Sequence, residues 1–465
     1  MLHFRPKQWH IGDVHPFCHN GLTYLYYLVP NGTLRCDACF ANPEHVVCRD
    51  GAVAVTADFV HWQECALEHA ILNVLPWQKD FLSCFTTGVL CRGQDMIHWQ
   101  PELAYTCQPQ TPPFPGGTRD HSLFYDTDLH ALRQTATAYH TNEHSGCGHG
   151  MDCGVMVTGP LSSRPCTQRM LIHFPNTARS LYTCLEPECS QMLRMGKRWA
   201  LLTSLARQSV HWVGAPSLWL GREDTPIDAQ DWNGIQPMQL DGEDLCAAQM
   251  AVCAEHWLLF GWIPLDYRDQ VWGGDLNLPR EIYLLPDGRP GSRLEPAYAQ
   301  RIRGDVIPVE IYPTPDESFG VLARAGRRLR NFGVHADFAA TPSGIQGILI
   351  DADNGIAAEF NRHSRVLRIV SRGQGRETFV FSHLTLDDGM DGAPMHMHVL
   401  YDEDIVEVFV NDRYALCARI NIRCRESSFG MFAAEGTQLL GMTAYRFRED
   451  AQVYTPGVQP VPFSR

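Results

Sequence analysis

Two short stretches of the chain repeat one another: Asp58-Phe-Val-His-Trp62 and, 37 residues later, Asp95-Met-Ile-His-Trp99. Each follows an apolar run of the kind that forms strands, and Ser209-Val-His-Trp212 is a looser copy. Repetition at this spacing is typical of propeller blades, in which each four-stranded sheet packs against its neighbours. Coincidence between two hairpins is the alternative interpretation.

The first three hundred residues have the pattern of an all-β domain. Short apolar and aromatic runs alternate with Gly, Pro, Asn and Asp, and no long helical periodicity is found. Together with the repeat, this pattern favours a propeller. The predicted strands include Thr23–Val29, Ala52–Thr56, Phe85–Cys91, His121–Tyr125, Arg198–Thr203 and His256–Trp262.

A second domain is expected after a proline-rich stretch between residues 290 and 320. Beyond it, short strands at close intervals are typical of a β-sandwich, and Ile405–Val410 followed by Asn411-Asp412 is the sharpest strand-and-turn signal. The predicted limits are a propeller over 1–296, a linker over 297–320, a β-sandwich over 321–450 and a C-terminal tail over 451–465. The remaining sandwich strands are predicted at Ile345–Ile350, Val366–Val370, Thr378–Ser382, Met397–Leu400 and Ala415–Ile420.

The composition restricts the partners of the chain. Of its 465 residues, 45% are hydrophobic and 19% charged, which is ordinary for a folded soluble protein and too apolar for a disordered one. The net charge of −14 and the absence of a Lys/Arg cluster argue against nucleic acid. No apolar run approaches the length of a membrane span, and no secretory signal follows Met1. We therefore expect a cytoplasmic protein without a membrane partner; the sequence does not reveal its oligomeric state.

The chain has 17 cysteines, and free buried thiols are the expected state of most of them. A zinc site is the alternative, because Cys36-x-x-Cys39 has ligand-like spacing and Cys147, His149 and Cys153 fall close together. Neither group has a second Cys-x-x-Cys motif, so we expect no bound metal. We also expect no organic cofactor.

Three acidic residues stand in contexts that suggest chemistry. Asp13 lies just before the first predicted strand, Asp120 follows Arg119, and Glu188 precedes Cys189. Each also has an ordinary explanation: a turn cap, a local ion pair and a solvated loop acid. In a propeller, however, the first strands of all blades surround one channel, so acids far apart in sequence are expected to converge there.

These segments resemble glycoside hydrolase family 32, the β-fructofuranosidases, over nearly the whole chain. That family has a tryptophan-led Asp near the N-terminus, an Arg-Asp pair and a Glu-Cys pair in the same order. The resemblance implies a five-bladed propeller followed by a sandwich. Further matching segments are Asp58–Trp62, Cys84-Phe-Thr-Thr-Gly88, Asp244-Leu-Cys-Ala-Ala-Gln249, Leu259-Phe-Gly-Trp262, Leu278-Pro-Arg-Glu281 and Asp404–Asp412.

The resemblance also implies a mechanism and an oligosaccharide or small glycoside as substrate. Asp13 would be the nucleophile of a retaining hydrolysis, Glu188 the general acid/base and Asp120 a stabiliser of the transition state. Arg119 beside Asp120 favours the ionised form of that carboxylate, whereas the acid must be held protonated. The substrate-binding residues implied are Trp9, Trp77, Phe85, Thr86, Arg119, Asp244, Gln249 and Trp262.

The chain also departs from the family pattern. Around the nucleophile, Gly12-Asp13-Val14-His15-Pro16 replaces the family's Asn-Asp-Pro-Asn-Gly, and Leu28 stands where a glutamine is expected. The beginning also resembles family 43, whose propellers hydrolyse arabinofuranosides and xylosides with inversion. The alternatives are therefore a pentofuranosidase of that type, a fructosyltransferase, or a carbohydrate-binding propeller without catalysis.

Overall fold

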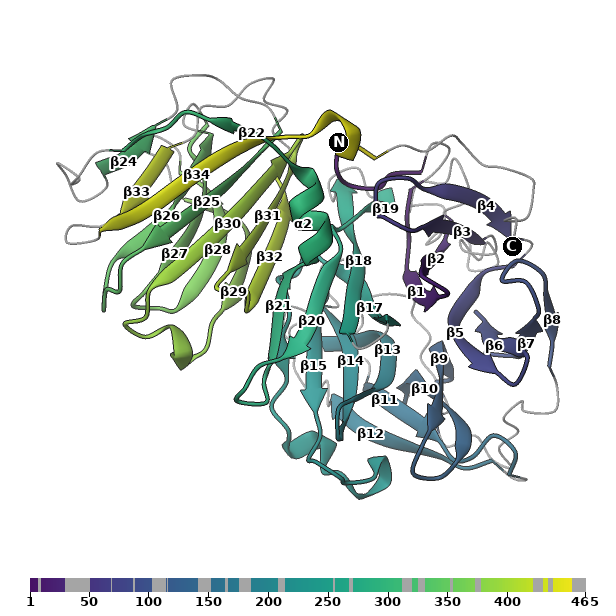
Figure 1. Ribbon diagram of the computed structural model, residues 1–465. Coiled ribbons are helices and arrows are strands. Elements are labelled where there is room, and N and C mark those ends of the chain that lie inside the picture. Colours follow the sequence, from purple (N-terminus) through teal and green to yellow (C-terminus); the bar gives the residue numbers. More distant parts are fainter. Residues whose placement is uncertain are drawn as a thin grey trace. The chain divides into compact units, whose positions relative to one another are not determined.

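The computed structural model (Figure 1) is nearly all β, as the sequence predicts. Its one α-helix among the described residues is α2 (Pro296–Ile302), and no described helix is long and apolar enough to cross a membrane. The structure describes residues 1–6, 10–29, 51–67, 69–86, 88–102, 114, 116–140, 152–163, 166–174, 185–207, 214–253, 256–266, 271–311, 320–324, 331–351, 354–372, 378–420, 430–433 and 438–453.

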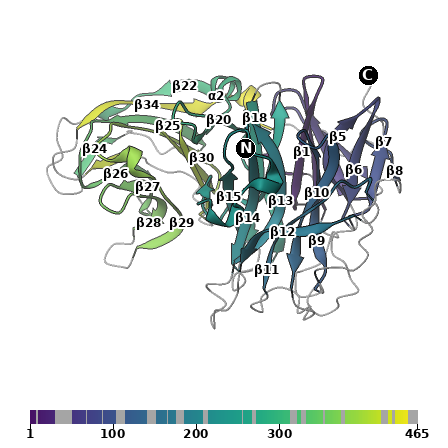
Figure 2. The same cartoon turned by 90° about the horizontal axis from the view of Figure 1, so that it is seen from below.

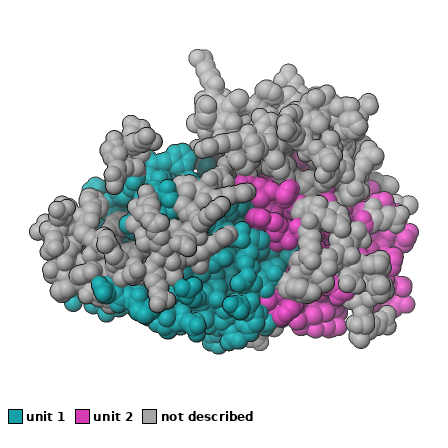
Figure 3. All heavy atoms as spheres, turned by 90° about the horizontal axis from the view of Figure 1, so that it is seen from above, with its two compact units in different colours: residues 1–4, 240–244, 277–453 teal, residues 5–239, 245–276, 454–465 magenta. Residues whose placement is uncertain are grey.

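The chain divides into two compact units, which Figure 3 shows in different colours. Unit 1 contains residues 1–4, 240–244 and 277–453, and unit 2 contains residues 5–239, 245–276 and 454–465. The domain limits expected at residues 296, 320 and 450 stay predictions.

Unit 2 contains four antiparallel sheets, each built from four strands that follow one another in the chain. After these four sheets, β17 pairs with β18, and β18 also pairs with β19. The first two sheets are β1 (Val14–His19), β2 (Leu22–Leu28), β3 (Gly51–Thr56) and β4 (Gln63–Leu67), then β5 (Ile71–Trp77), β6 (Asp80–Phe85), β7 (Leu90–Gly93) and β8 (Trp99–Pro101).

The third and fourth sheets repeat this plan. Their strands are β9 (Thr118–Asp126), β10 (Ala131–Tyr139), β11 (Cys153–Thr158) and β12 (Gln168–Phe174), then β13 (Leu185–Met195), β14 (Arg198–Arg207), β15 (Gly214–Leu220) and β16 (Met238–Gln239). The three strands of the last group are β17 (Cys246–Cys253), β18 (His256–Asp266) and β19 (Val271–Leu276). One predicted strand, Phe85–Cys91, is wrong, because β6 ends at Phe85 and β7 begins only at Leu90.

The sequence repeat marks equivalent turns in the first two sheets. Asp58 Oδ1 accepts hydrogen bonds from the backbone N–H groups of Val60 and His61, and its Oδ2 lies 2.8 Å from His61 Nδ1. Asp95 makes the same contacts, with 2.7 Å between Oδ2 and His98 Nδ1. Both turns connect the third and fourth strands of a sheet, so the repeat is a structural equivalence and not a coincidence. The copy at Ser209 lies outside the described residues.

Unit 1 contains two large antiparallel sheets, ordered β22-β34-β25-β30-β31-β32 and β23-β24-β33-β26-β27-β28-β29 (Figure 2). Residues of both sheets share one hydrophobic core, in which Phe332, Ile348, Phe360 and Val408 are fully buried. Burial of such side chains contributes roughly 1.5–3 kcal/mol each. The first sheet consists of β22 (Arg303–Ile307), β25 (Phe332–Phe338), β30 (Met395–Asp402), β31 (Ile405–Val410), β32 (Tyr414–Arg419) and β34 (Leu439–Phe447).

The second sheet lies over the same core. Its strands are β23 (Glu310–Ile311), β24 (Gly320–Arg324), β26 (Ile345–Asp351), β27 (Ile356–Asn361), β28 (Val366–Ser371), β29 (Phe379–Thr385) and β33 (Gly430–Ala433). The residues of unit 1 also include the hairpin of β20 (Arg280–Leu284) and β21 (Pro290–Leu294). The 3-10 helices are η3 (Ile227–Ala229), η4 (Trp232–Gly234), η5 (Asp388–Met390) and η6 (Glu449–Ala451).

A fully buried ionic network lies inside unit 1. His3 Nδ1 is 2.7 Å from Asp402 Oδ2, and its Nε2 is 3.1 Å from Glu407 Oε1. The Arg280 guanidinium donates to Glu407 Oε2 at 2.6 Å and to Asp241. Burial lowers the pKa of His3, but the two carboxylates outweigh this effect and raise it to about 9. The network therefore holds His3 as a cation at neutral pH.

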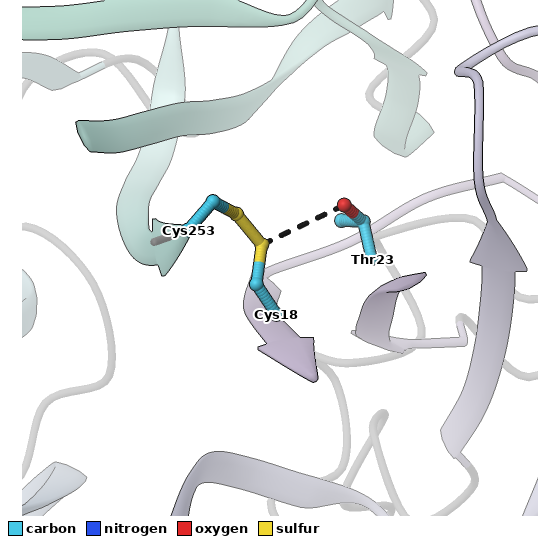
Figure 4. Close-up of a disulfide and its surroundings, with 3 residues drawn as sticks. All are labelled: Cys18, Thr23 and Cys253. Carbon is cyan, nitrogen blue, oxygen red and sulfur yellow. Dashed lines mark hydrogen bonds between the residues drawn. A yellow bond between two sulfur atoms is a disulfide. The ribbon is translucent and has the colours of Figure 1, made fainter. Parts of the chain in front are cut away.

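Most of the described cysteines are buried free thiols, as the sequence predicts, and one pair forms a disulfide. The free cysteines of the described chain are buried, as expected. Cys18 on β1 and Cys253 on β17 instead form a disulfide, with 5.3 Å between their Cα atoms (Figure 4). Because 235 residues separate them, no spacing pattern could predict this pairing. The buried free cysteines are Cys65, Cys84, Cys91, Cys153, Cys166, Cys189, Cys246 and Cys417.

The candidate zinc ligands lie mainly in undescribed segments. Cys36, Cys39, Cys147 and His149 are outside the described residues, and the Cys153 thiol lies 3.5 Å from the carbonyl oxygen of Leu185. Within the described ranges, no group of three or more His, Cys, Asp or Glu side chains is arranged to hold a metal ion.

Candidate active site

Asp13 is fixed by backbone pairing on both sides. Ile11 forms a two-way bridge with Gly274 on β19, and the N–H of Leu28 donates to the Asp13 carbonyl at 3.1 Å. The Trp262 indole donates to Asp13 Oδ1 at 3.2 Å. A side chain at Gly274 would meet the carbonyl oxygen of Ile263 at 1.8 Å, so this close approach requires glycine. Asp13 is therefore held rigidly between strands that are distant in sequence.

Arg119, at the start of β9, is the centre of an acidic cluster. Its Nη1 donates to Asp120, its Nη2 donates to Glu186 at 2.6 Å and to Glu188 at 3.1 Å, and its Nε donates to the Tyr139 hydroxyl at 2.5 Å. One guanidinium thus connects three carboxylates from two strands. Such charge-assisted, forked contacts fix carboxylate geometry better than single hydrogen bonds do.

Glu188 and Asp13 are shifted toward protonation by their surroundings. Burial raises the pKa of Glu188 to about 8; Arg119 opposes this rise, and Glu186, Asp120 and Asp13 add to it. Burial and the nearby Asp120 raise the pKa of Asp13 to about 6, against the Trp262 hydrogen bond and Arg119. At pH 7, Asp13 is therefore mostly ionised and Glu188 mostly protonated, the division of roles that glycosidic cleavage by two carboxyl groups needs.

Backbone irregularities place the acidic residues. The pairing register is interrupted where each of four strands pairs with the strand that follows it. These strands are β5, β9, β13 and β17. At each interruption a residue other than glycine has a positive φ: Asn73 (35°), Asp120 (54°), Cys189 (51°) and Ala247 (46°). Bulges of this kind change the direction of side chains and are frequent beside active sites. Two of the four lie at or next to a predicted catalytic residue.

A chain of polar contacts next to the carboxylates connects β1, β5, β9, β13 and β17. His15 Nδ1 on β1 lies 3.1 Å from Asn73 Oδ1 on β5 and 2.9 Å from Gln249 Oε1 on β17. The Asn73 amide donates to Ser122 Oγ on β9, and the Gln249 amide donates to the Cys189 carbonyl on β13 at 3.1 Å. Burial lowers the pKa of His15, so the ring is neutral and its Nδ1 proton is donated to the two amide oxygens.

The structure brings Asp13, Asp120 and Glu188 together, along with the predicted binding residues Arg119 and Trp262. Trp262 is only 2% exposed, and its indole N–H donates to Asp13. Gln249, also predicted as a binding residue, is buried in the polar chain described above.

Other predicted binding residues lie apart from these contacts. Phe85 is half-buried with its ring 5.3 Å from that of His69, and Thr86 is exposed in the turn after β6. Trp77 lies at the end of β5, with its ring 6.0 Å from that of Tyr125.

Asp244 belongs to unit 1, where its carboxylate accepts the backbone N–H of Arg419 at 3.4 Å. Trp9 lies outside the described residues.

Sequence reasoning missed Glu186, Tyr139 and His15. Glu186 had a visible signal, because residues two apart on a strand share one face and Glu188 was already a candidate. Tyr139 gave no signal, since its contact with Arg119 depends on the pairing of β9 with β10. His15 was visible only as a departure from the family pattern.

Comparison with known proteins agrees with this architecture. Residues 336–445 match the family model described as glycosyl hydrolases family 32 C terminal. No curated protein matches the chain in a sequence search.

Solved structures of similar fold include sucrose-6-phosphate hydrolase from Lactobacillus gasseri (TM-score 0.67, 13% identity, 97% of this chain and 93% of that one). Exo-inulinase from Aspergillus awamori (0.66, 14%, 97% and 98%) and fructan 1-exohydrolase IIa from Cichorium intybus (0.67, 12%, 98% and 98%) are also similar. The resemblance to family 32 is thus confirmed: residues 336–445 match the model of the family's C-terminal part, and the chain shares the fold of these glycoside hydrolases.

Proposed function

We propose that the protein is a glycoside hydrolase that removes terminal β-fructofuranosyl residues with retention of configuration. Asp13 is the nucleophile, Glu188 the general acid/base and Asp120 the stabiliser of the oxocarbenium-like transition state. The proposal rests on geometry: Arg119 holds the Asp120 and Glu188 carboxylates, and Trp262 donates to Asp13. Burial and the neighbouring acids raise the pKa of Asp13 to about 6 and that of Glu188 to about 8. Two carboxyl groups in one cluster with separated pKa values identify a base and an acid.

In the first step, the ionised Asp13 carboxylate attacks the anomeric carbon while Glu188 donates its proton to the glycosidic oxygen. The carbon–oxygen bond breaks, the alcohol leaves, and a glycosyl ester forms on Asp13. The Trp262 hydrogen bond keeps one oxygen of Asp13 oriented and favours its ionised form. Arg119 holds Asp120 so that its carboxylate can bind sugar hydroxyls.

In the second step, Glu188 is a carboxylate and acts as a base. It takes a proton from water as the water oxygen attacks the anomeric carbon, and the ester bond to Asp13 breaks. The two displacements together restore the original configuration and return both carboxyl groups to their starting states. A sugar hydroxyl in place of water gives transfer rather than hydrolysis.

The proposed fold is a five-bladed propeller followed by a β-sandwich. The polar chain from His15 to Gln249 supports it, because it includes one residue from each of β1, β5, β9, β13 and β17. The similar structures named above are a sucrose-6-phosphate hydrolase, an exo-inulinase and a fructan 1-exohydrolase. We extend their shared fructosyl chemistry to this chain, with an oligosaccharide or small glycoside as substrate.

A panel of aryl glycosides tests the proposal. The purified protein is incubated with aryl β-fructofuranoside, α-arabinofuranoside and β-xyloside, and with sucrose and inulin. Release of aglycone from the fructofuranoside supports the proposal. Release only from the pentosides would replace it with the family 43 type of activity, and saturable binding of fructans without turnover of any substrate would leave a carbohydrate-binding protein.

A further inference from the structure

Glu186 is a second carboxylate on the strand that carries Glu188. Both residues keep regular pairing with β14, Glu186 opposite Ala206 and Glu188 opposite Ser204. Because side chains two apart on a strand point to the same face, Glu186 and Glu188 are directed to the same partner. That partner is Arg119, whose Nη2 donates to both of them.

The two carboxylates share this nitrogen unequally. The distance from Arg119 Nη2 to Glu186 Oε1 is 2.6 Å, and that to Glu188 Oε1 is 3.1 Å. The Tyr139 hydroxyl donates to the same Glu186 oxygen and accepts from Arg119 Nε at 2.5 Å. Glu186, Tyr139 and Arg119 therefore form a closed set of contacts that holds the guanidinium on the Glu186 side.

We propose that Glu186 is a positioning residue for the acid/base: it keeps Arg119 from pairing fully with Glu188, so that Glu188 retains the proton it donates. This inference rests on the proposed function. It gives Arg119 two separable tasks, orientation of Asp120 through Nη1 and engagement by Glu186 through Nη2.

The charges around Glu188 agree with this role. Burial raises the pKa of Glu186, but Arg119 and Tyr139 outweigh this effect and lower it, so Glu186 remains an anion. The charged groups with the largest effect on Glu188 are Arg119, which favours its ionised form, and Glu186, Asp120 and Asp13, which disfavour it. The largest effects on the pKa of Asp13 come from burial, Asp120, Trp262, Arg119 and Cys189. Removal of Glu186 should therefore affect Glu188 more than Asp13.

The test is the pH dependence of kcat/KM for Glu186→Gln on sucrose or inulin, because their unactivated leaving groups need the proton of Glu188. Glutamine is similar in shape and keeps an oxygen acceptor for Arg119 and Tyr139, but it lacks the charge. Loss of the charge and a stronger Arg119–Glu188 contact both lower the pKa of Glu188. We expect the basic limb of the profile to move to lower pH by about one unit, while the acidic limb, set by Asp13, stays in place.

Two further variants separate positioning from general structural damage. Glu186→Asp retains the charge, so its basic limb should lie closer to that of the wild type even if kcat falls. Glu223→Gln removes an exposed carboxylate paired with Arg198 and should leave both limbs unchanged. Equal shifts of both limbs in Glu186→Gln, or a basic limb at its wild-type pH, would overturn the inference.

A second readout does not depend on turnover. Water-soluble carbodiimides activate protonated carboxyl groups, which an added amine then converts to amides. Peptide mapping after labelling between pH 5 and 9 gives the midpoint at which Glu188 loses reactivity. We expect a lower midpoint in Glu186→Gln than in the wild type. If no glycoside is hydrolysed, the proposed function fails, and this midpoint still decides the inference: an unchanged value overturns it.

Discussion

Replacement of Glu188 by glutamine tests the origin of the acid. A glutamate with the ordinary value of 4.5 is protonated to only about 0.3% at pH 7, whereas a pKa of about 8 gives about 90%. The environment thus enriches the acid form roughly 300-fold. General acid catalysis typically contributes ~10²–10⁴-fold to the rate. Glu188→Gln should therefore lower kcat/KM on sucrose or inulin by ~10²–10⁴-fold. An aryl fructofuranoside with an activated leaving group needs no proton and should lose less than about tenfold.

The assay is initial-rate kinetics on both substrate types between pH 5 and 9, with Glu223→Gln as the control. The wild type should show a bell-shaped kcat/KM profile with limbs near pH 6 and 8, set by Asp13 and Glu188. Glu188→Gln should lose the basic limb. Equal losses on the two leaving groups, or a basic limb that survives the substitution, would refute the assignment of Glu188 as the acid.

Three other perturbations give independent tests. Asp13→Ala should lower turnover by roughly 10⁴-fold or more on every substrate, because no nucleophile remains. Azide that attacks in place of Asp13 should give a glycosyl azide of inverted configuration, whereas azide should rescue the Glu188 variant with retained configuration. The pKa of His3 is about 9 in the folded protein and 6.5 in the unfolded chain, so protonated His3 stabilises the fold. This contribution is complete below pH 6.5 and is lost as the pH rises through 9. Urea unfolding should show a fall of about 3 kcal/mol over this range that is absent in His3→Gln. The Cys18→Ser/Cys253→Ser variant should be less stable by about 2–5 kcal/mol in urea unfolding at fixed pH; a midpoint equal to that of the wild type would argue against the disulfide.

The local structure was largely predictable from the sequence. A run of β-branched and aromatic residues followed by Asn411-Asp412 placed Ile405–Val410 as it occurs in β31, and the repeated Asp-x-x-His-Trp turns marked equivalent places in two sheets. The end of β6 at Phe85 and the start of β7 at Leu90 were missed, because the apolar residues on both sides were interpreted as one continuous strand. The apolar pattern reports burial, and burial does not distinguish one long strand from a short hairpin.

The site was predictable where its residues carry a signal of their own. The residues next to Asp13, Asp120 and Glu188, and the order of the three segments in the chain, indicated that the three acids share a role. The contacts among Arg119, Glu186 and Tyr139 were not predictable, because they depend on which strands pair and on where bulges turn the backbone. The same limit explains the disulfide, whose two cysteines are 235 residues apart in the sequence and lie together on β1 and β17.

The central claim is a retaining cleavage in which Asp13 forms a covalent intermediate. Methanol as acceptor tests it directly, because the methyl fructofuranoside formed does not mutarotate and so preserves the configuration of the product. The protein is incubated with an aryl β-fructofuranoside in dilute methanol, and the first-formed product is identified by NMR. We expect methyl β-fructofuranoside. Methyl α-fructofuranoside as the first product would show a single displacement and contradict it.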